Sequence, residues 1–181
     1  DPSVNLQKCI DKSNSTIFFS ATLLPIGYYK RLLSTAEDNY AIYAQSTFAQ
    51  TQRLLAFGRD VSTKYTRRNR EEYEKIADYI STVTEAQQGN YMVFFPSYRL
   101  MQDVYEVFAG KAADSCEILM QHSNMKEHER EAFLEEFEHE RERTLVAFCV
   151  MGGIFGEGID LKNDRLIGAI IVGTGLPQVL S

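Results

Sequence analysis

The stretch "YMVFFPSYRLM", residues 91–101, indicates the fold class more clearly than any other part of the chain. Its first five residues are apolar, which is typical of a strand buried on both faces in a parallel sheet. Pro96 ends this strand, and Ser97 is a favourable N-cap for a helix. The apolar face of that helix would comprise Met101, Val104, Tyr105 and Phe108. A buried strand followed directly by an amphipathic helix predicts an α/β fold.

The same pattern recurs on both sides of this stretch. An amphipathic helix is expected over 71–87, and strands are expected at 117–120, 144–150 and 166–172. Asn124 and Glu127 have the spacing of a capping box. The helix that they would start has an apolar face made of Phe133, Leu134 and Phe137. Alternating strands and helices predict a three-layer αβα domain with a mainly parallel sheet.

The first seventy residues are less regular. "STIFFSATL" (15–23) is apolar enough to predict another buried strand, followed by a short helix over 26–33. Residues 36–50 are expected to be a connection with one short strand. "RLLAFG" (53–58) is a further apolar segment.

In parallel sheets, ligands bind beyond the carboxyl ends of the strands. The sequence places polar and glycine-rich segments at each such end. They are Pro96-Ser97-Tyr98, Gln121-His122-Ser123, residues 152–160 and Gly173-Thr174-Gly175. Function is therefore expected at this one edge of the sheet.

"GGIFGEGIDL" (152–161) begins like a phosphate-binding P-loop but has Ile159 and Asp160 where that loop needs Lys and Ser or Thr. It is therefore not expected to hydrolyse a nucleotide by itself. An ordinary glycine-rich turn is one interpretation. The other is a functional loop, in which Glu157 and Asp160 accept hydrogen bonds from a ribose or orient an arginine of another surface.

Charge and composition narrow the partners only partly. The 181-residue chain has a net charge of −6, which excludes nucleic-acid binding through an overall positive field but not through a local groove. "KYTRRNR" (64–70) is either a nucleic-acid contact or a solvated lead-in to the following helix. No apolar run is long enough for a membrane span.

Metal and thiol chemistry have little support in the sequence. His128 and Glu129 begin a zinc-protease motif, but Ala132 stands in place of its second histidine. Glu157 and Asp160 with His122 would be a weak metal site. Cys149 lies within an apolar strand, where its thiol is expected to be protonated and inert.

Taken together, four segments resemble the XPD/DinG-type DNA helicases, in the right order and over nearly the whole chain. "FFSATLLPIGYY" (18–29) resembles their S-[AG]-T-L-x-P motif, and "RLLAFGRDVSTKY" (53–65) resembles their lead into the second motor domain. "MVFFPSYRLM" (92–101) and "GGIFGEGIDLKNDRLIGAIIVGTGLPQV" (152–179) resemble their later motifs. The "SAT" and "RDVSTKY" segments favour the bacterial DinG-like branch.

This resemblance implies a RecA-like (P-loop NTPase-like) fold and a fragment of a longer helicase. Residues 1–36 would be the tail of the first motor domain, and residues 37–181 the second, truncated before its last motif. The resemblance assigns three sets of roles. Ser20, Ala21 and Thr22 would couple nucleotide state to the DNA strand. Nucleic-acid binding would fall to Ser97, Tyr98, Gln121, His122 and Ser123. The nucleotide cleft would be lined by Gly156, Glu157, Gly158 and Asp160.

The implied protein is an ATP-dependent 5′-to-3′ DNA helicase of DNA repair or replication, with cytoplasmic, nucleoid-associated location. Its partners would be single-stranded DNA and the first motor domain, which would hold ATP and Mg²⁺. No cofactor is expected in this fragment, and an iron–sulfur cluster elsewhere in the longer protein is left open. Alone, the fragment is expected to be inactive. Two alternatives are a non-catalytic RecA-like interaction module and a small-molecule transferase, of which the second leaves "SAT" and "FFPSY" unexplained.

Overall fold

The computed structural model describes residues 2–112, 115–156 and 158–175. The chain divides into two compact units, residues 1–55 and residues 56–181, which are described separately. This division reflects which residues pack together within the chain. It does not test the boundary between the two motor domains that the resemblance places between residues 36 and 37, which stays a prediction.

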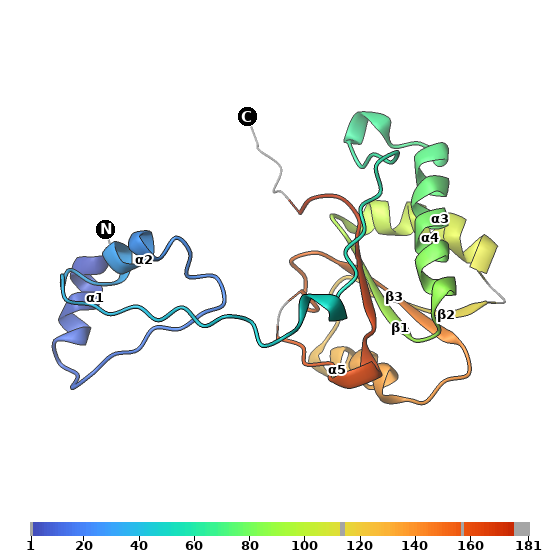
Figure 1. Ribbon diagram of the computed structural model, residues 1–181. Helices are drawn as coiled ribbons and strands as arrows, with labels where there is room; N and C mark the ends of the chain where they lie inside the picture. The colour runs from blue at the N-terminus through green and yellow to red at the C-terminus, as the bar shows by residue number, and fades with distance from the viewer. Residues whose placement is uncertain (1, 113–114, 157, 176–181) are drawn as a thin grey trace. The chain divides into compact units, whose positions relative to one another are not determined.

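The second unit is built on a sheet of four parallel strands. In sequence order these are β1 (Asn90–Phe95), β2 (Cys116–Met120), β3 (Thr144–Val150) and β4 (Gly168–Ile171). Their order across the sheet is β2-β3-β1-β4, so the most apolar strands, β1 and β3, lie at its centre (Figure 1). The register aligns Met92 with Ala147 on one side and with Ala169 on the other. The predicted parallel sheet is confirmed.

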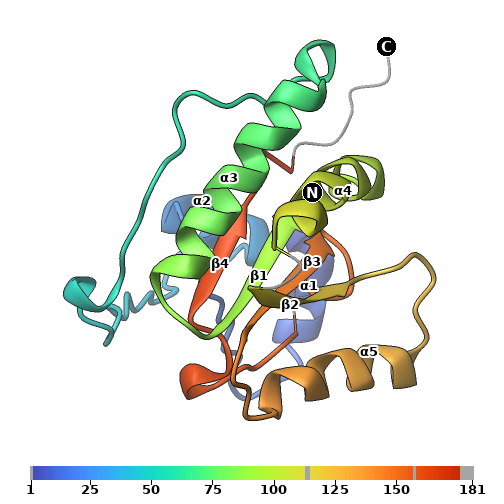
Figure 2. The ribbon, with the colours of Figure 1, turned by 90° about the vertical axis from the view of Figure 1, so that its right-hand side faces the viewer.

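Helices cover both faces of this sheet. The helices α3 (Arg70–Ala86) and α4 (Tyr98–Ala112) pack on one face. The opposite face is covered by α5 (Glu127–Glu135) and the 3₁₀ helix η3 (Glu136–Glu138) (Figure 2). The three-layer αβα architecture predicted from the alternating pattern is confirmed.

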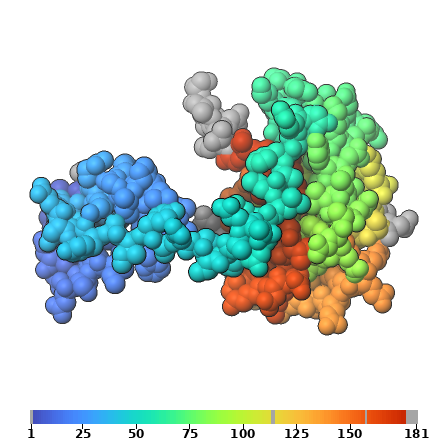
Figure 3. Space-filling view, in the orientation of Figure 1, coloured from blue at the N-terminus to red at the C-terminus, as the bar shows by residue number. Residues whose placement is uncertain are grey.

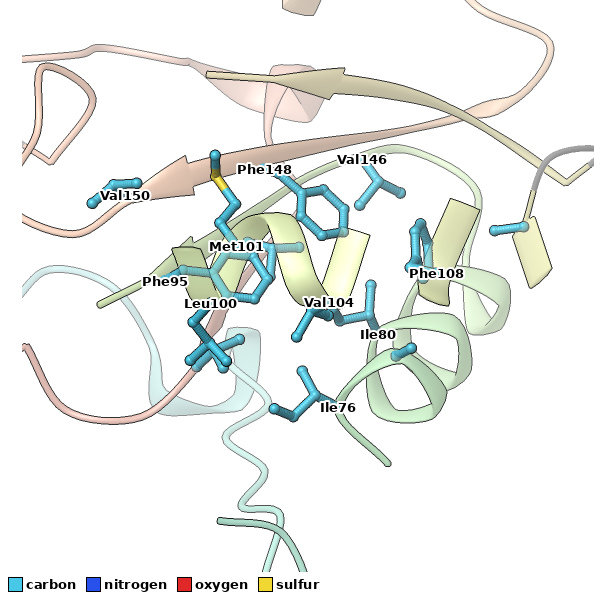
Figure 4. Packing of buried hydrophobic residues seen from close by; sticks show 14 of the residues in the cluster. Ile76, Ile80, Phe95, Leu100, Met101, Val104, Phe108, Val146, Phe148 and Val150 are labelled. Carbon is cyan, nitrogen blue, oxygen red and sulfur yellow. The ribbon is translucent and has the colours of Figure 1, made fainter. Parts of the chain in front are cut away.

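The core of the second unit follows the alternation of side chains along β1 and β3. Phe95, Val146 and Phe148 point toward α3 and α4 (Figure 4), and together with Val93 they belong to the larger cluster. Met92, Leu145, Ala147 and Cys149 point toward α5 and form the smaller one. Every residue of β3 is buried. Because both faces are covered, these strands must be apolar throughout, which is why their sequence shows no polar alternation.

The first unit differs from the prediction. It contains α1 (Ser3–Ile10), α2 (Ile26–Leu33) and the 3₁₀ helix η1 (Gln50–Gln52), and its described residues include no strand. The buried strand predicted at 15–23 and the short strand predicted within 36–50 are therefore wrong here. Ile17 is 82% exposed and Phe19 is 91% exposed. A strand needs hydrogen-bonding neighbours, and this unit offers none.

Two smaller predictions also need correction. Asn124 does not cap α5. Its backbone has a positive φ of 63°, and the N-cap is Lys126, whose backbone N–H donates to Glu129 Oε2 at 2.7 Å. Only this half of a capping box is present, two residues later than predicted, because the lysine side chain cannot accept a hydrogen bond in return. The last strand is four residues long, shorter than the predicted 166–172. In the part of the chain that the structure describes, no helix combines the length and apolarity of a membrane span.

Candidate functional site at the carboxyl edge of the sheet

The predicted site residues of the second unit follow the strand ends. Ser97 and Tyr98 come directly after β1 and start α4. The Ser97 hydroxyl accepts a hydrogen bond from the Leu100 N–H at 3.3 Å, and its carbonyl accepts one from Met101 N–H at 3.1 Å. The predicted N-cap is therefore confirmed. It fixes the first turn of α4, so that the neighbouring Tyr98 side chain, 39% exposed, stands at the edge of the sheet.

Gln121 occupies an unexpected position. The sequence predicted a residue that contacts nucleic acid, but its side chain is inside the protein and the residue is only 2% exposed. The side-chain oxygen accepts from Val150 N–H at 2.9 Å, and the side-chain nitrogen donates to Tyr98 Oη at 3.0 Å. The amide thereby joins the carboxyl ends of β3 and β1, and its burial separates it from the exposed residues that follow it.

His122 and Ser123 are exposed immediately beyond Gln121. The His122 Nε2 atom lies 3.9 Å from Glu129 Oε1 of α5. The Tyr98 hydroxyl lies 3.5 Å from the His122 carbonyl oxygen, which is a long contact. These residues and Tyr98 therefore share one exposed surface at the ends of β1 and β2.

The glycine-rich loop begins at the end of β3. Its first turn is closed by Gly153 N–H to the Val150 carbonyl at 3.2 Å and by Gly156 N–H to the Gly153 carbonyl at 2.9 Å. Gly152 has a φ of +68° and Gly158 has a φ of +71°, a backbone region where side chains are disfavoured. This tight turn exposes Gly156 and Gly158, two of the predicted nucleotide-cleft residues.

The predicted carboxylates of this loop have different outcomes. Asp160 is exposed and pairs with Lys162 at 3.1 Å. Glu157 lies outside the described residues. Asp160 belongs to no cluster that could hold a metal ion, since no such group of His, Cys, Asp or Glu occurs among the residues that the structure covers.

The coupling residues predicted in the first unit form a local turn. Ser20 Oγ accepts from Thr22 N–H at 3.2 Å and contacts Thr22 Oγ1 at 3.2 Å. Ser20, Ala21 and Thr22 are all exposed. The Ser20 and Thr22 hydroxyls therefore remain accessible to a partner.

Thiol chemistry is not supported at this edge. Cys116 and Cys149 are buried free cysteines, and for Cys149 this burial was predicted. Burial raises the pKa of Cys149 to about 12, so its thiol is protonated at neutral pH. The site therefore offers hydrogen-bonding groups, exposed backbone and carboxylates.

A family model, the helicase C-terminal domain, matches residues 80–181. The chain belongs to this family. It is of the XPD/DinG type predicted from the motifs, and the match covers all four strands and the edge described above.

Individual relatives agree with this assignment of the helicase domain. The chain is 22% identical over its whole length to the "ATP-dependent DNA helicase CHL1" of Yarrowia lipolytica, and it spans 24% of that protein. Two solved structures, "XPD_APO" and "XPD_Helicase", each align with 66% of the chain with a TM-score of 0.51 and 23% identity. The chain covers 23% and 20% of these two structures, respectively. Their likeness confirms the RecA-like fold.

Two residues that hold the glycine-rich loop of the helicase domain escaped the sequence analysis. Phe155 is buried and stacks on Phe133 of α5 with 4.2 Å between ring centroids. Arg130, also from α5, donates to the carbonyls of Ile154 at 3.2 Å and Gly158 at 3.3 Å. The apolar pair Ile154-Phe155 among glycines was a signal for the first anchor. Nothing in the local sequence pointed to the second.

The segment between residues 56 and 69, which leads into α3, also reaches this edge of the sheet. It lies on the surface of the helicase domain beside α3 (Figure 3). Glu72 of α3 holds it by accepting from Ser62 N–H at 2.8 Å and from Arg67 at 2.6 Å. These bonds, the backbone bond first, hold the pKa of Glu72 below its ordinary value. A Cβ on Gly173, just beyond β4, would lie 2.5 Å from Thr63 Oγ1.

Proposed function

We propose that this helicase domain is the second motor domain of an ATP-dependent DNA helicase that moves 5′ to 3′ along single-stranded DNA and separates duplexes. The observation that carries the proposal is the juxtaposition, at one edge of the sheet, of two different surfaces. One comprises Tyr98, His122 and Ser123, and the other is the glycine-rich loop 152–160. A motor needs a strand contact and a nucleotide contact that are mechanically joined.

The nucleotide part of the proposal follows from what the loop lacks. Without a P-loop lysine and hydroxyl, residues 152–160 cannot hold a triphosphate with Mg²⁺ by themselves. ATP and Mg²⁺ would be bound mainly by the first motor domain. Gly156, Gly158, Glu157 and Asp160 would form the opposite wall of the cleft, where carboxylates accept hydrogen bonds from ribose or orient an arginine.

The DNA part of the proposal rests on exposed donors. The Tyr98 hydroxyl, the Ser123 hydroxyl and His122 can donate to phosphate oxygens, and such contacts hold a strand without reading its sequence. A net charge of −6 makes this a local groove and not a broad basic surface. Gln121 would support this surface from within instead of contacting DNA.

The proposal predicts that the full-length protein hydrolyses ATP in a manner stimulated by single-stranded DNA and unwinds duplexes that have a 5′ tail. It predicts no ATP turnover by residues 1–181 alone. Both follow from a nucleotide site shared between two domains. Turnover and strand separation on 5′-tailed and 3′-tailed substrates are the measurements. Robust turnover by residues 1–181, or no DNA-stimulated turnover by the full-length protein, would contradict the proposal, and the second result would favour the non-catalytic module.

Tyr98→Phe tests the strand contact, with Tyr79→Phe as its matched control. Tyr79 is an exposed tyrosine on α3 whose hydroxyl donates to Asp60. Loss of a hydrogen bond to a charged phosphate should weaken single-strand binding by the full-length protein about tenfold in the Tyr98 variant only. Fluorescence anisotropy with a labelled oligonucleotide measures this. Equal binding by both variants would remove Tyr98 from the proposed groove.

The repair or replication role, the bacterial DinG-like branch and the nucleoid-associated location stay predictions from the sequence motifs.

A further inference from the structure

The side chain of Gln121 connects the ends of three strands. Its own backbone N–H continues the β2–β3 ladder by donating to the Phe148 carbonyl at 2.9 Å. Its side-chain amide then bonds to Val150 at the end of β3 and to Tyr98 beyond β1. A buried amide with every bond directed to a different strand end is rigidly held, because each unmade bond would leave a buried polar group unsatisfied.

The polarity of this network has a chemical consequence for Tyr98. A backbone N–H can only donate, so the Gln121 oxygen must face Val150, and the NH₂ group must face Tyr98. The Tyr98 oxygen therefore accepts from Gln121, and its own O–H can only donate. Within the protein it donates to the His122 carbonyl over a long 3.5 Å. Gln121 thus holds the half-exposed Tyr98 as a hydrogen-bond donor, and an external phosphate would replace this long internal bond.

The same amide also touches the glycine-rich loop. A Cβ placed on Gly153 would lie 3.1 Å from the Gln121 nitrogen and 3.0 Å from the Val150 carbonyl oxygen. The loop backbone therefore packs closely on the amide, and a side chain at residue 153 would need the amide or the Val150 carbonyl to shift. Any rearrangement of the turn at Gly153 changes the space available to the amide that holds Tyr98.

We infer that Gln121 is a positioning residue that fixes the Tyr98 hydroxyl as a donor to a DNA phosphate and links it to the glycine-rich loop. This inference rests on the proposed function. It replaces the predicted direct contact between Gln121 and nucleic acid with an indirect role. The relay consists of the loop turn at Gly153, the Gln121 amide and the Tyr98 hydroxyl.

Gln121→Glu tests the relay, because a carboxylate has the size of the amide but accepts a hydrogen bond from Tyr98 where the amide NH₂ donates one. As a carboxylate, residue 121 still accepts from Val150 but also accepts the Tyr98 O–H, which removes the donor from the phosphate. Single-strand binding by the full-length protein should weaken about fivefold or more, and the stimulation of ATP turnover by DNA should fall by a similar factor. Anisotropy and steady-state turnover measure the two effects.

The pH dependence of DNA binding by Gln121→Glu separates a change in hydrogen-bond direction from damage to the fold. Burial raises the pKa of a carboxyl, and the protonated acid donates to Tyr98 as the amide does. Binding by the variant should therefore approach that of the wild type as the pH falls. The titratable groups near this position are Tyr98 of α4, His122 and, next to His122, Glu129 of α5. The wild type carries all three, so the ratio of dissociation constants at each pH isolates the substitution.

Asn90→Asp is the matched control, the same amide-to-acid change at the opposite edge of the sheet. Asn90 is 8% exposed, and its amide donates to the Phe137 carbonyl at 3.2 Å and the Arg165 carbonyl at 3.0 Å. This variant should lose stability without changing DNA binding relative to the wild type. Gln121→Met is the second variant should Gln121→Glu not fold, and it should weaken binding at every pH.

The outcomes separate the inference from the proposed function. A wild-type protein that neither binds single strands nor responds to them overturns both. A wild type that binds, with Gln121→Glu and Gln121→Met binding equally well at all pH values, overturns the inference alone. An additive effect of Gln121→Glu in a Tyr98→Phe background also overturns it, because residue 121 would then act without Tyr98.

Discussion

Phe19 and Phe148 are both phenylalanines in strongly apolar stretches, but their environments are opposite. Phe148 of β3 is fully buried, and its ring stacks on Phe95 of β1 with 5.3 Å between centroids. Phe19 is 91% exposed, in a first unit whose buried described residues are only Ser3 and Ser34. The two stretches have the same kind of sequence and lie in two independently packed units.

This difference shows that an apolar run specifies a strand only when neighbours are present. β1 has partners on both sides and helices above and below it, so its backbone groups are paired and its side chains are covered. Residues 15–23 have neither within their own unit. Under the proposed function, a first motor domain would supply those partners, and the comparison can be tested with matched substitutions.

The largest effect is expected in the sheet. Phe148→Ala should lower the free energy of unfolding by about 3–5 kcal/mol, because it leaves a cavity among Phe95, Tyr105 and Phe108. Urea denaturation of the 181-residue chain, followed by circular dichroism, measures it. A loss below about 1 kcal/mol would mean that the sheet is not the stable part of the chain.

An intermediate, local effect is expected for segment 56–69, which has little regular structure but is pinned to α3. Glu72→Gln weakens the pairing with Arg67 and the bond from Ser62, so amide protection at Ser62 should fall while β1 stays protected. Hydrogen exchange measures this. Because the pKa of Glu72 is lowered in the folded state, the wild-type contribution is present above the unfolded pKa. It should be lost only as the pH falls below about 4. Unchanged protection would show that apolar packing alone holds the segment.

The smallest effect is expected in the first unit. Phe19→Ala should change the stability of the 181-residue chain by no more than about 0.5 kcal/mol, since the side chain contacts mainly solvent. In the full-length protein we expect a clearly larger loss, because the proposed first motor domain would cover this stretch. Thermal unfolding of both lengths makes the comparison. An equally small effect in the full-length protein would argue against that covering domain.

Much of the second unit was predictable because its signals are local. The all-apolar runs at 91–95 and 144–150 and the helix-capping Ser97 each report on a few consecutive residues, and the structure confirms them. The start of α5 was misplaced because asparagine is favoured both at helix N-caps and in turns. Here Asn124 has the positive φ of a turn, whereas Lys126 has the extended backbone of an N-cap.

The candidate site was only partly predictable. Strand ends in a parallel sheet meet at one edge, so the grouping of Tyr98, Gln121 and the glycine-rich loop followed from the strand pattern alone. The inward direction of Gln121 did not, because its partners Val150 and Tyr98 lie 29 and 23 residues away in the chain. The same holds for Arg130, whose acceptor carbonyls lie 24 and 28 residues away.

The sequence by itself determined the fold class, the family and the edge of the sheet where function is concentrated, since each depends on local periodicity and short motifs. Tertiary structure decided which apolar runs are buried, which polar residue faces inward and what holds the glycine-rich loop. Burial and hydrogen bonding depend on segments distant in the chain. Gln121 and Phe19 are the two clearest examples, because the polar residue is buried and the apolar one is exposed.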